Sequence, residues 1–380
     1  MNIYQLGNIR DNKAVLQTLG VKCEGVEIMS KKMELFCFYI KDLKTPAVNI
    51  LKQDALSIGA ELAVPSGVII YEKPLYDCIL IGTKKHIEIL SRKELVQPFG
   101  LKGVAKELKK FLSIKTYPLQ IMGIINTNDD SFFEGSRFVA QDALLKCHKM
   151  IDEGASIIDI GAVSSRPGSQ EVSEEEELAR VKPLCDAIMA EKLYEKVIFS
   201  IDSYTPLVVE YALQSGFSLI NDITGAGNEE LIRLALKYDA KLCIMHMQGT
   251  PQMMQKNPQY EDVMTEVSDF FETRIAKCEA LGLSKEHLVL DVGIGFGKTL
   301  EHNLVLLKNL VHFKKFGCEL LVGASRKSMI DKITPVPIHE RLPGTLAIHL
   351  KAVENGASII RCHDVAEHQQ ALKVFEALIR

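Results

Sequence analysis

The sequence contains no apolar run that approaches the roughly 18 residues of a membrane-spanning helix. Its start, from Met1 to Gln5, has neither the basic segment nor the apolar segment of a secretory signal. We therefore expect a cytoplasmic protein that does not associate with membranes.

Cysteine pairs and excess basic charge are also missing. The nine cysteines are scattered without a CxxC pair, so we expect reduced core residues rather than disulfides or a zinc site. The net charge is −4 and the isoelectric point is near 6.2, whereas a general nucleic-acid surface needs a basic stripe that neutralises phosphates. No nucleic-acid partner is expected, although a small anionic ligand needs only a local basic site.

Length and composition indicate a folded protein of more than one module. The chain has 380 residues, of which 47% are hydrophobic and 25% charged, an ordinary globular composition. One α/β barrel occupies roughly 250 residues, which leaves room for a second module. We predict a small α/β domain at residues 1–115 and a barrel at residues 116–380.

The first 115 residues alternate strand-like and helix-like segments. The apolar, β-prone segments are 34–40, 67–71 and 76–81, and the helical patterns are 47–58 and 101–112. The lysine-rich stretch 106–110 is typical of the solvated face of a helix. Since nothing here specifies chemistry, we expect a structural or regulatory accessory role.

From Pro118 onward, short and nearly continuous apolar strands alternate with amphipathic helices, the pattern of strands buried on both faces of a parallel sheet. The predicted strands are 121–126, 156–161, 197–202, 219–223, 241–247, 288–292, 320–324 and 359–363. Eight such units predict an α/β fold of the closed (β/α)₈ type, a TIM barrel, preceded by the small α/β domain.

Polar residues stand at the carboxyl ends of these strands, which converge on one face of a barrel, where active sites of this fold lie. They are Asn126, Asp159, Asp202, Asn221 with Asp222, His246 with Gln248, Asp291, Ser325 to Lys327, and Arg361 to Asp364. A single such residue is more often a helix cap or turn former. Eight strands with the same feature favour an active site.

Several ordered motifs then resemble the dihydropteroate synthase family over the last 260 or so residues. They are Met122-Gly123-Ile124-Ile125-Asn126 with Asp130-Ser131-Phe132; Asp159-Ile160-Gly161 with Ser165-Arg166-Pro167-Gly168; Ser200-Ile201-Asp202; Ile220-Asn221-Asp222-Ile223; Met245-His246-Met247-Gln248-Gly249-Thr250-Pro251; Asp291-Val292-Gly293-Ile294-Gly295-Phe296-Gly297-Lys298; Ser325-Arg326-Lys327; and Arg361-Cys362-His363-Asp364. The resemblance implies an enzyme that condenses 6-hydroxymethyl-7,8-dihydropterin pyrophosphate with p-aminobenzoate in folate biosynthesis. It also implies Mg²⁺ as cofactor, with Asn126 as its contact, and a homodimer through the barrel helices.

The pterin presents an amino group and a ring N–H, a donor edge that suits the carboxylate of Asp291. The resemblance assigns neighbouring ring atoms to Asn221, Asp202 and Lys327, and Asp159 joins this set of candidate substrate-binding residues. Phe296 and Met245 are candidate apolar walls, although plain core packing explains either one equally well.

The leaving group is pyrophosphate, so positive charge is needed where negative charge develops. Arg361 and His363 fit this role because their i, i+2 spacing on a strand directs both side chains to one face and Cys362 to the other. Lys327 and Asp130 complete the candidate catalytic residues.

The loops after the first two barrel strands close over the site in the resembled family. Ser165 and Arg166 are the expected contacts to the second substrate or pyrophosphate, or Arg166 pairs with Asp130 or Glu134 to hold the loops shut. Both loops depart from the family pattern: Asn128-Asp129 stands for Thr-Pro, and Ala162-Val163-Ser164-Ser165 for Gly-Glu-Ser-Thr. These changes bear on aminobenzoate binding more than on pterin binding.

Two alternatives follow: a pterin-binding homologue without synthase activity, and a folate-dependent methyltransferase of the same superfamily, which would need no pyrophosphate site. A nucleotide-binding P-loop at 293–299 is rejected because its required earlier glycine falls at Val292. His246 lacks partners at metal-ligand spacing, which argues against zinc.

Overall fold

The computed structural model describes residues 3, 6, 11–127, 136–163, 172–249, 253–254 and 257–379. Its contacts divide the chain into two compact units, one of Met1–Ile114 with Glu376–Arg380 and one of Lys115–Phe375. Each unit has its own hydrophobic core. Within the described residues, no helix combines the length and apolarity that crossing a membrane requires.

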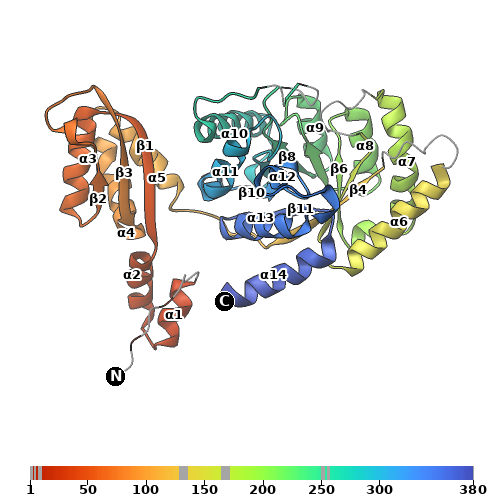
Figure 1. Ribbon diagram of the computed structural model, residues 1–380, viewed down its shortest axis with the longest axis horizontal. Helices are drawn as coiled ribbons and strands as arrows, with labels where there is room; N and C mark the ends of the chain where they lie inside the picture. The colour runs from red at the N-terminus through yellow and green to blue at the C-terminus, as the bar shows by residue number, and fades with distance from the viewer. Residues whose placement is uncertain are drawn as a thin grey trace. The chain divides into compact units, whose positions relative to one another are not determined.

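The first unit is built on a three-stranded antiparallel sheet in the order β1-β3-β2 (Figure 1). Its elements are α1 (Asn12–Thr18), α2 (Cys23–Met33), β1 (Leu35–Lys44), α3 (Thr45–Ser57), β2 (Glu61–Ala63), η1 (Ser66–Val68), β3 (Leu75–Thr83), α4 (Lys84–Lys93), η2 (Glu94–Val96) and α5 (Leu101–Lys110). Alternate residues of β3, among them Cys78 and Leu80, are buried with Leu51 of α3 and Leu90 of α4. The helices therefore cover one face of the sheet.

One strand predicted in this unit is wrong. Residues 67–71 were expected to be β-structure, but they form the end of η1 and a turn. Tyr71 has φ of +56°, outside the strand region, and Ile69 and Ile70 are 85% and 77% exposed. Among the described residues, the sheet of this unit contains only β1, β3 and β2, and none of them pairs with this apolar run.

The second unit is a closed barrel of eight parallel strands in the order β10-β11-β4-β5-β6-β7-β8-β9 (Figure 1). Its strands are β4 (Gln120–Asn126), β5 (Ile157–Gly161), β6 (Ile198–Asp202), β7 (Leu219–Asp222), β8 (Lys241–Met245), β9 (Leu288–Asp291), β10 (Glu319–Val322) and β11 (Ile359–Cys362). The predicted TIM barrel is confirmed, and each observed strand falls on a predicted one.

Helices follow the barrel strands and form an outer ring. They are α6 (Ser136–Asp152), α7 (Glu174–Ala190), η3 (Leu193–Glu195), α8 (Pro206–Gln214), α9 (Glu229–Lys237), α10 (Val263–Ala280), η4 (Lys285–His287), α11 (Leu300–Lys308), η5 (Leu310–Phe316), α12 (Ser328–Ile333), η6 (Ile338–Glu340), α13 (Leu342–Glu354) and α14 (Val365–Ile379). Several begin at a capping side chain: Ser173 accepts from the N–H of Glu176, and Asp262 from that of Thr265.

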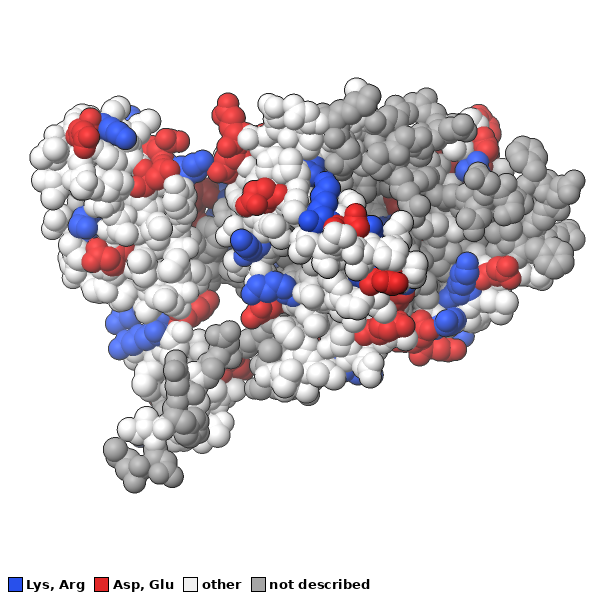
Figure 2. Space-filling model, in the orientation of Figure 1, with Lys and Arg blue, Asp and Glu red and all other residues white. Residues whose placement is uncertain are grey.

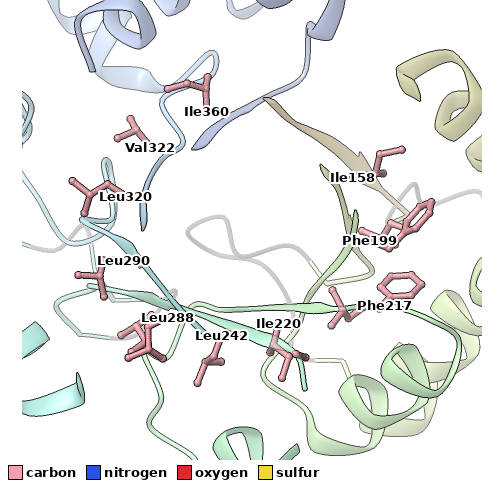
Figure 3. Packing of buried hydrophobic residues seen from close by; sticks show 14 of the residues in the cluster. Ile158, Phe199, Phe217, Ile220, Leu242, Leu288, Leu290, Leu320, Val322 and Ile360 are labelled. Atoms are coloured by element: carbon pink, nitrogen blue, oxygen red, sulfur yellow. The ribbon is translucent and has the colours of Figure 1, made fainter. Parts of the chain in front are cut away.

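The outer face of the strands forms the main core. Figure 3 shows Phe199, Leu290 and Ile360 pointing from their strands away from the barrel centre, toward the helices. A second, smaller cluster fills the barrel interior: Met122, Ile157, Leu219, Cys243, Val289, Leu321 and Ile359. Both faces of every strand are therefore buried, which explains the continuous apolar runs.

All nine cysteines are free. Seven are buried, as expected, but Cys23 and Cys37 are exposed on the first unit, so the prediction of core residues was wrong for these two. On the face drawn in Figure 2, acidic and basic side chains are intermixed over the described surface.

Candidate active site

The candidate site begins one layer above the apolar interior of the barrel. Because side chains alternate along a strand, the second inward residue follows the interior apolar residue by two positions. These second residues are Ile124, Asp159, Ser200, Asn221, Met245, Asp291, Gly323 and Arg361. Five of the eight are polar, so the inside of the barrel changes from apolar to polar toward the carboxyl ends of the strands.

Arg361 links two carboxylates across this layer. Its Nε donates to Asp159 Oδ2 at 2.7 Å, and its Nη2 donates to Asp202 Oδ2 at 2.8 Å. Burial disfavours the guanidinium charge, but Asp159 and Asp202 outweigh that effect and raise the pKa of Arg361. Neither of these two hydrogen bonds uses the Nη1 N–H groups.

Asp159 lies beneath this arginine with no exposed surface. Besides Arg361, it accepts from Ser200 Oγ at 2.5 Å and from Asn221 Nδ2 at 2.9 Å. Both of its oxygens are therefore engaged by protein side chains. Asp159 is placed to orient Arg361 and Asn221, and the direct substrate contact predicted for it stays a prediction.

Asp202 sits at the end of β6 and faces the same arginine. Burial raises the pKa of Asp202 to about 7, because the nearby positive charge of Arg361 offsets only part of the desolvation. This carboxyl group therefore changes its protonation close to neutral pH.

A second cluster forms at the end of β9. Asp291 is buried and accepts from the N–H of Gly293 at 2.7 Å, in a turn where Gly293 has φ of +68°. Burial raises the pKa of Asp291, and Lys327 opposes that rise. The Lys327 ammonium donates to the carbonyl of Ile294 and lies 4.4 Å from the centroid of the Phe296 ring.

Burial lowers the pKa of Lys327 to about 8, while Asp291 acts to raise it. The four side chains assigned to the pterin, Asp202, Asn221, Asp291 and Lys327, thus stand at the ends of β6, β7 and β9 and after β10. Met245 is buried on β8 beside Asp291, its partner in the β8–β9 register.

His363 follows β11 and is exposed. Its Nδ1 shares a hydrogen bond of 2.8 Å with Ser325 Oγ, from the loop after β10. In the same pair of loops, Arg326 binds the carboxylate of Asp364 with two hydrogen bonds, of 3.1 and 2.5 Å. Cys362, between Arg361 and His363, is buried in the outer core, so the predicted opposite orientation is confirmed.

Asn126 ends β4 with an exposed side chain, next to Gly161 of β5 in the barrel register. An amide oxygen is a suitable Mg²⁺ ligand, and Mg²⁺ that binds a phosphate needs few protein ligands. Across the described part of the chain, no three histidine, cysteine, aspartate or glutamate side chains gather as a metal site. The residues present fit a cation held by one amide, waters and phosphate oxygens.

Three predicted site residues lie outside the described residues: Asp130, Ser165 and Arg166. The roles predicted for these three residues and for their two loops therefore stay predictions. Of those loops, Thr127 is buried and its hydroxyl donates to the carbonyl of Gly161.

Two side chains of the site were missed by reasoning from sequence. Ser200 stands two residues before Asp202, so the alternation of β6 could have placed it inside the barrel. Lys298 stands in one of the family motifs and in the rejected P-loop but was given no role. It is 2% exposed, and its Nζ bonds His246 Nδ1 at 2.9 Å and the carbonyl of Phe296 at 2.9 Å. No local signal distinguishes such a buried lysine from an exposed one.

His246 faces this lysine. Burial and the Lys298 charge lower the pKa of His246 to about 3, and burial lowers the pKa of Lys298 to about 7. The pair ties the loop that contains Phe296 to the end of β8.

Comparisons with known proteins agree with this geometry. The family model of pterin binding enzymes matches residues 122–363. The dihydropteroate synthase of Escherichia coli strain K12 is 45% identical over 260 residues, which make up 68% of this chain and 91% of that protein. Such relatives correspond to the barrel unit.

One relative extends over both units. The bifunctional dihydropteroate synthase/dihydropteroate reductase of Helicobacter pylori is 41% identical over 367 residues, or 96% of each chain. The alignment therefore includes most of the first 114 residues.

Solved structures show the same similarity. The dihydropteroate synthase of Yersinia pestis, in complex with a sulfonamide drug, matches with a TM-score of 0.64 and 40% identity over 70% of this chain and 95% of that one. The Thermus thermophilus enzyme in complex with 4-aminobenzoate matches with a TM-score of 0.61 and 37% identity, over 69% and 95%. This chain belongs to the dihydropteroate synthase family of pterin-binding enzymes, which are transferases.

Proposed function

We propose that the barrel joins the exocyclic methylene carbon of 6-hydroxymethyl-7,8-dihydropterin pyrophosphate to the amine of p-aminobenzoate. In this reaction the C–O bond to pyrophosphate breaks, a C–N bond forms, and the amine loses a proton, giving 7,8-dihydropteroate and pyrophosphate. The observation that carries the residue roles is the Arg361 guanidinium, which Asp159 and Asp202 hold through its Nε and Nη2 at the carboxyl ends of the strands.

The pterin is assigned to the carboxyl ends of β6 to β9. Asp291 accepts from the amino group and ring N–H, Asn221 pairs with the neighbouring atoms, and Lys327 donates to the ring carbonyl or nitrogen. Asp202 accepts from a further ring N–H through the oxygen that Arg361 does not engage. Phe296 and Met245 supply apolar contacts. A ligand that lacks these donors leaves buried polar groups unpaired, which is how such a site discriminates.

Pyrophosphate is assigned to Arg361 and His363, with Ser165 and Arg166 as further contacts. Mg²⁺, held by Asn126, supplies additional positive charge to the phosphates when bound. Arg361 is pre-oriented by two carboxylates, so little reorganisation is needed as charge develops on the leaving oxygen.

No covalent enzyme nucleophile is required. The aromatic amine attacks a methylene that the conjugated pterin already makes electron-poor, and the protein contributes by holding the two substrates together. The loops with Asp130 and Arg166 would order p-aminobenzoate and exclude water.

The test is pyrophosphate release by the full chain with dihydropterin pyrophosphate and Mg²⁺, with and without p-aminobenzoate. Release that requires the amine and is lost when Mg²⁺ is chelated supports the proposal. Tight pterin binding without release would instead support the alternative of a pterin-binding homologue that has lost activity. The methyltransferase alternative predicts no pyrophosphate release at all.

The pH dependence of this reaction follows from two groups. The ionised form of Asp202 accepts a hydrogen bond more strongly than the protonated form. Its pKa is about 7, so kcat/KM for the pterin substrate should rise with pH through about 7. The ammonium form of Lys327 donates more strongly than the neutral amine. Its pKa is about 8, so kcat/KM should fall above about 8. We expect a narrow bell-shaped profile for kcat/KM, which reports the free enzyme.

Two substitutions test which group produces each limb of the pH profile. Asp202→Asn should remove the part of the acid limb that is due to Asp202. The substrate phosphate has a pKa of about 6, and any acid limb that it causes should remain. Lys327→Arg should remove the basic limb, because arginine stays protonated. An unchanged acid limb in Asp202→Asn would exclude Asp202 as its source.

A second activity is favoured by the relative that spans both units. We propose that the chain also reduces dihydropteroate, and that this activity depends on the first unit. Barrel-only relatives of about the same identity are described as synthases alone, whereas the full-length relative is described as a synthase and reductase. The reaction adds a hydride and a proton to a C=N bond of the pterin and requires a donor such as a reduced nicotinamide or flavin.

Deletion of residues 1–114 should separate the two activities. The shortened chain is expected to retain synthase activity, since relatives that match the barrel alone are synthases, and to lose reduction of dihydropteroate. The measurement follows tetrahydropteroate formation with each donor for both chains. Equal reduction by the shortened chain would place the activity in the barrel, and no reduction by the full chain would contradict the proposal.

Two expectations about the cellular state of the enzyme belong with this proposal. A homodimer through the barrel helices is tested by light scattering of the purified chain. A cytoplasmic location is tested by fractionation of cells that express it.

A further inference from the structure

Two histidines that the synthase chemistry does not use lie under the loops of β10 and β11. His349 belongs to α13 and His368 to α14, and each is 1% exposed. The N–H of Ala324 bonds His349 Nε2 at 3.0 Å, His349 Nδ1 bonds His368 Nε2 at 2.8 Å, and His368 Nδ1 bonds the carbonyl of Asp364 at 2.6 Å.

The two backbone groups at the ends of this series of three hydrogen bonds fix the direction of each bond in it. A backbone N–H can only donate, so His349 Nε2 accepts from Ala324 and carries no proton. His349 Nδ1 therefore donates to His368 Nε2, and His368 Nδ1 donates to the carbonyl of Asp364, which can only accept. Both rings must be neutral and protonated at Nδ1, which is the less common form of a free imidazole.

The surroundings agree with neutral rings. Burial lowers the pKa of both histidines, and the charge of Lys327 lowers that of His349 further. Protonation of either ring would place two donors against each other and break this series of hydrogen bonds.

These hydrogen bonds join the segment with Lys327, which is assigned to the pterin, to the segment with Arg361 and His363, which are assigned to pyrophosphate. Ala324 directly precedes Ser325 to Lys327, and Asp364 directly follows Arg361 to His363. The same loops are joined nearer the surface by the Ser325 to His363 hydrogen bond and the Arg326 to Asp364 ion pair. Loss of the histidines would leave the buried Ala324 N–H unpaired, a penalty that shifts the backbone toward a new partner.

We propose that His349 and His368 are positioning residues: a chain of two imidazoles that fixes the β10 loop with Lys327 against the β11 loop with Arg361 and His363. This inference rests on the proposed function, because those side chains bind the pterin and pyrophosphate there. The histidines touch neither substrate and act through the backbone of Ala324 and Asp364.

The first test reads the protonation of the rings directly. Long-range ¹H–¹⁵N spectra of the ¹⁵N-histidine-labelled full chain are compared with those of His349→Phe and His368→Phe, which assign the signals. We expect both rings as neutral Nδ1–H forms at pH 7. An Nε2–H form or an imidazolium at either position would overturn the proposal, whether or not the enzyme is active.

The second test is a steady-state kinetic comparison. Small misplacements of catalytic groups are costly, so His349→Phe and His368→Phe should each lower kcat/KM for dihydropterin pyrophosphate by about ten- to a hundredfold. The KM for p-aminobenzoate should stay within about twofold, and the double variant should be no worse than about twofold below either single one, because both changes break one chain. His148→Phe, at a partly exposed position on α6, serves as the control that leaves activity unchanged.

A folded His349→Phe with unchanged kinetic constants would overturn the positioning role, as would fully additive losses in the double variant. These outcomes are distinct from failure of the proposed function, in which the unmodified chain itself would release no pyrophosphate while the ring protonation stayed as expected.

Discussion

Replacement of Arg361 by methionine is expected to lower both the activity and the stability of the barrel. Pyrophosphate release should fall by about 10²- to 10³-fold, since a preorganised donor at the developing charge is lost. The substitution also leaves the fully buried Asp159 without its cation. Removing one partner of a buried ion pair costs about 3 to 5 kcal/mol, which urea unfolding of the barrel would measure.

A second substitution separates the two effects. Asp159→Asn combined with Arg361→Met removes the uncompensated carboxylate, so much of the stability should return while activity does not. Arg233→Met is the matched control, because Arg233 forms an exposed ion pair with Glu229 on α9, of a kind worth at most about 1 kcal/mol. If Arg361→Met unfolded at the same urea concentration as this control, the buried pair would not stabilise the barrel.

Asp291→Asn should weaken binding of the pterin substrate by about 10³-fold or more. A carboxylate accepts from two donors of the pterin edge, whereas an amide turns one N–H₂ group toward a donor and leaves a buried group unpaired. The Gly293 N–H can still bond the remaining oxygen, so the turn should persist. Calorimetric titration with dihydropterin pyrophosphate, without p-aminobenzoate, measures the effect.

The same variant makes a second, independent prediction. Asp291 acts to raise the pKa of Lys327, so its neutralisation should move the basic limb of any remaining activity to lower pH. Asp239→Asn is the control, since Asp239 is exposed and has φ of +53°, a conformation that asparagine tolerates. Pterin binding by Asp291→Asn equal to that of this control would exclude Asp291 from the pterin site.

The barrel was predictable because the composition of each strand shows that both of its faces are buried. A strand buried on both faces is apolar at nearly every position, and eight such segments with helices between them leave few other architectures. The predicted 219–223 and 288–292 differ from β7 and β9 by a single residue at the carboxyl end. That end is where polar side chains begin and the apolar pattern stops.

The first unit was less predictable because its sheet is partly exposed. Helices α1, α2 and α4 and strand β2 were not predicted, and residues 67–71 were placed in a strand. A Cβ at Gly67 would lie 2.1 Å from the Glu72 carboxylate, so a tight turn around this glycine replaces the strand. An apolar run alone does not show whether a neighbouring strand exists to receive it.

The sequence by itself determined the class of fold, the family, and which residues face the inside of the barrel. The alternation of side chains along a strand and the position where each of the eight strands ends are both local properties of the sequence. Only the tertiary structure decided which of those residues meet. Closure places β11 beside β4 and Arg361 against Asp159 and Asp202, roughly 160 to 200 positions earlier in the chain. It also buries Lys298 against His246 and joins His349 to His368, contacts that no spacing along the chain encodes. Such pairs depend on the angle at which strands and helices pack, and that angle is set by the whole core rather than by any one segment.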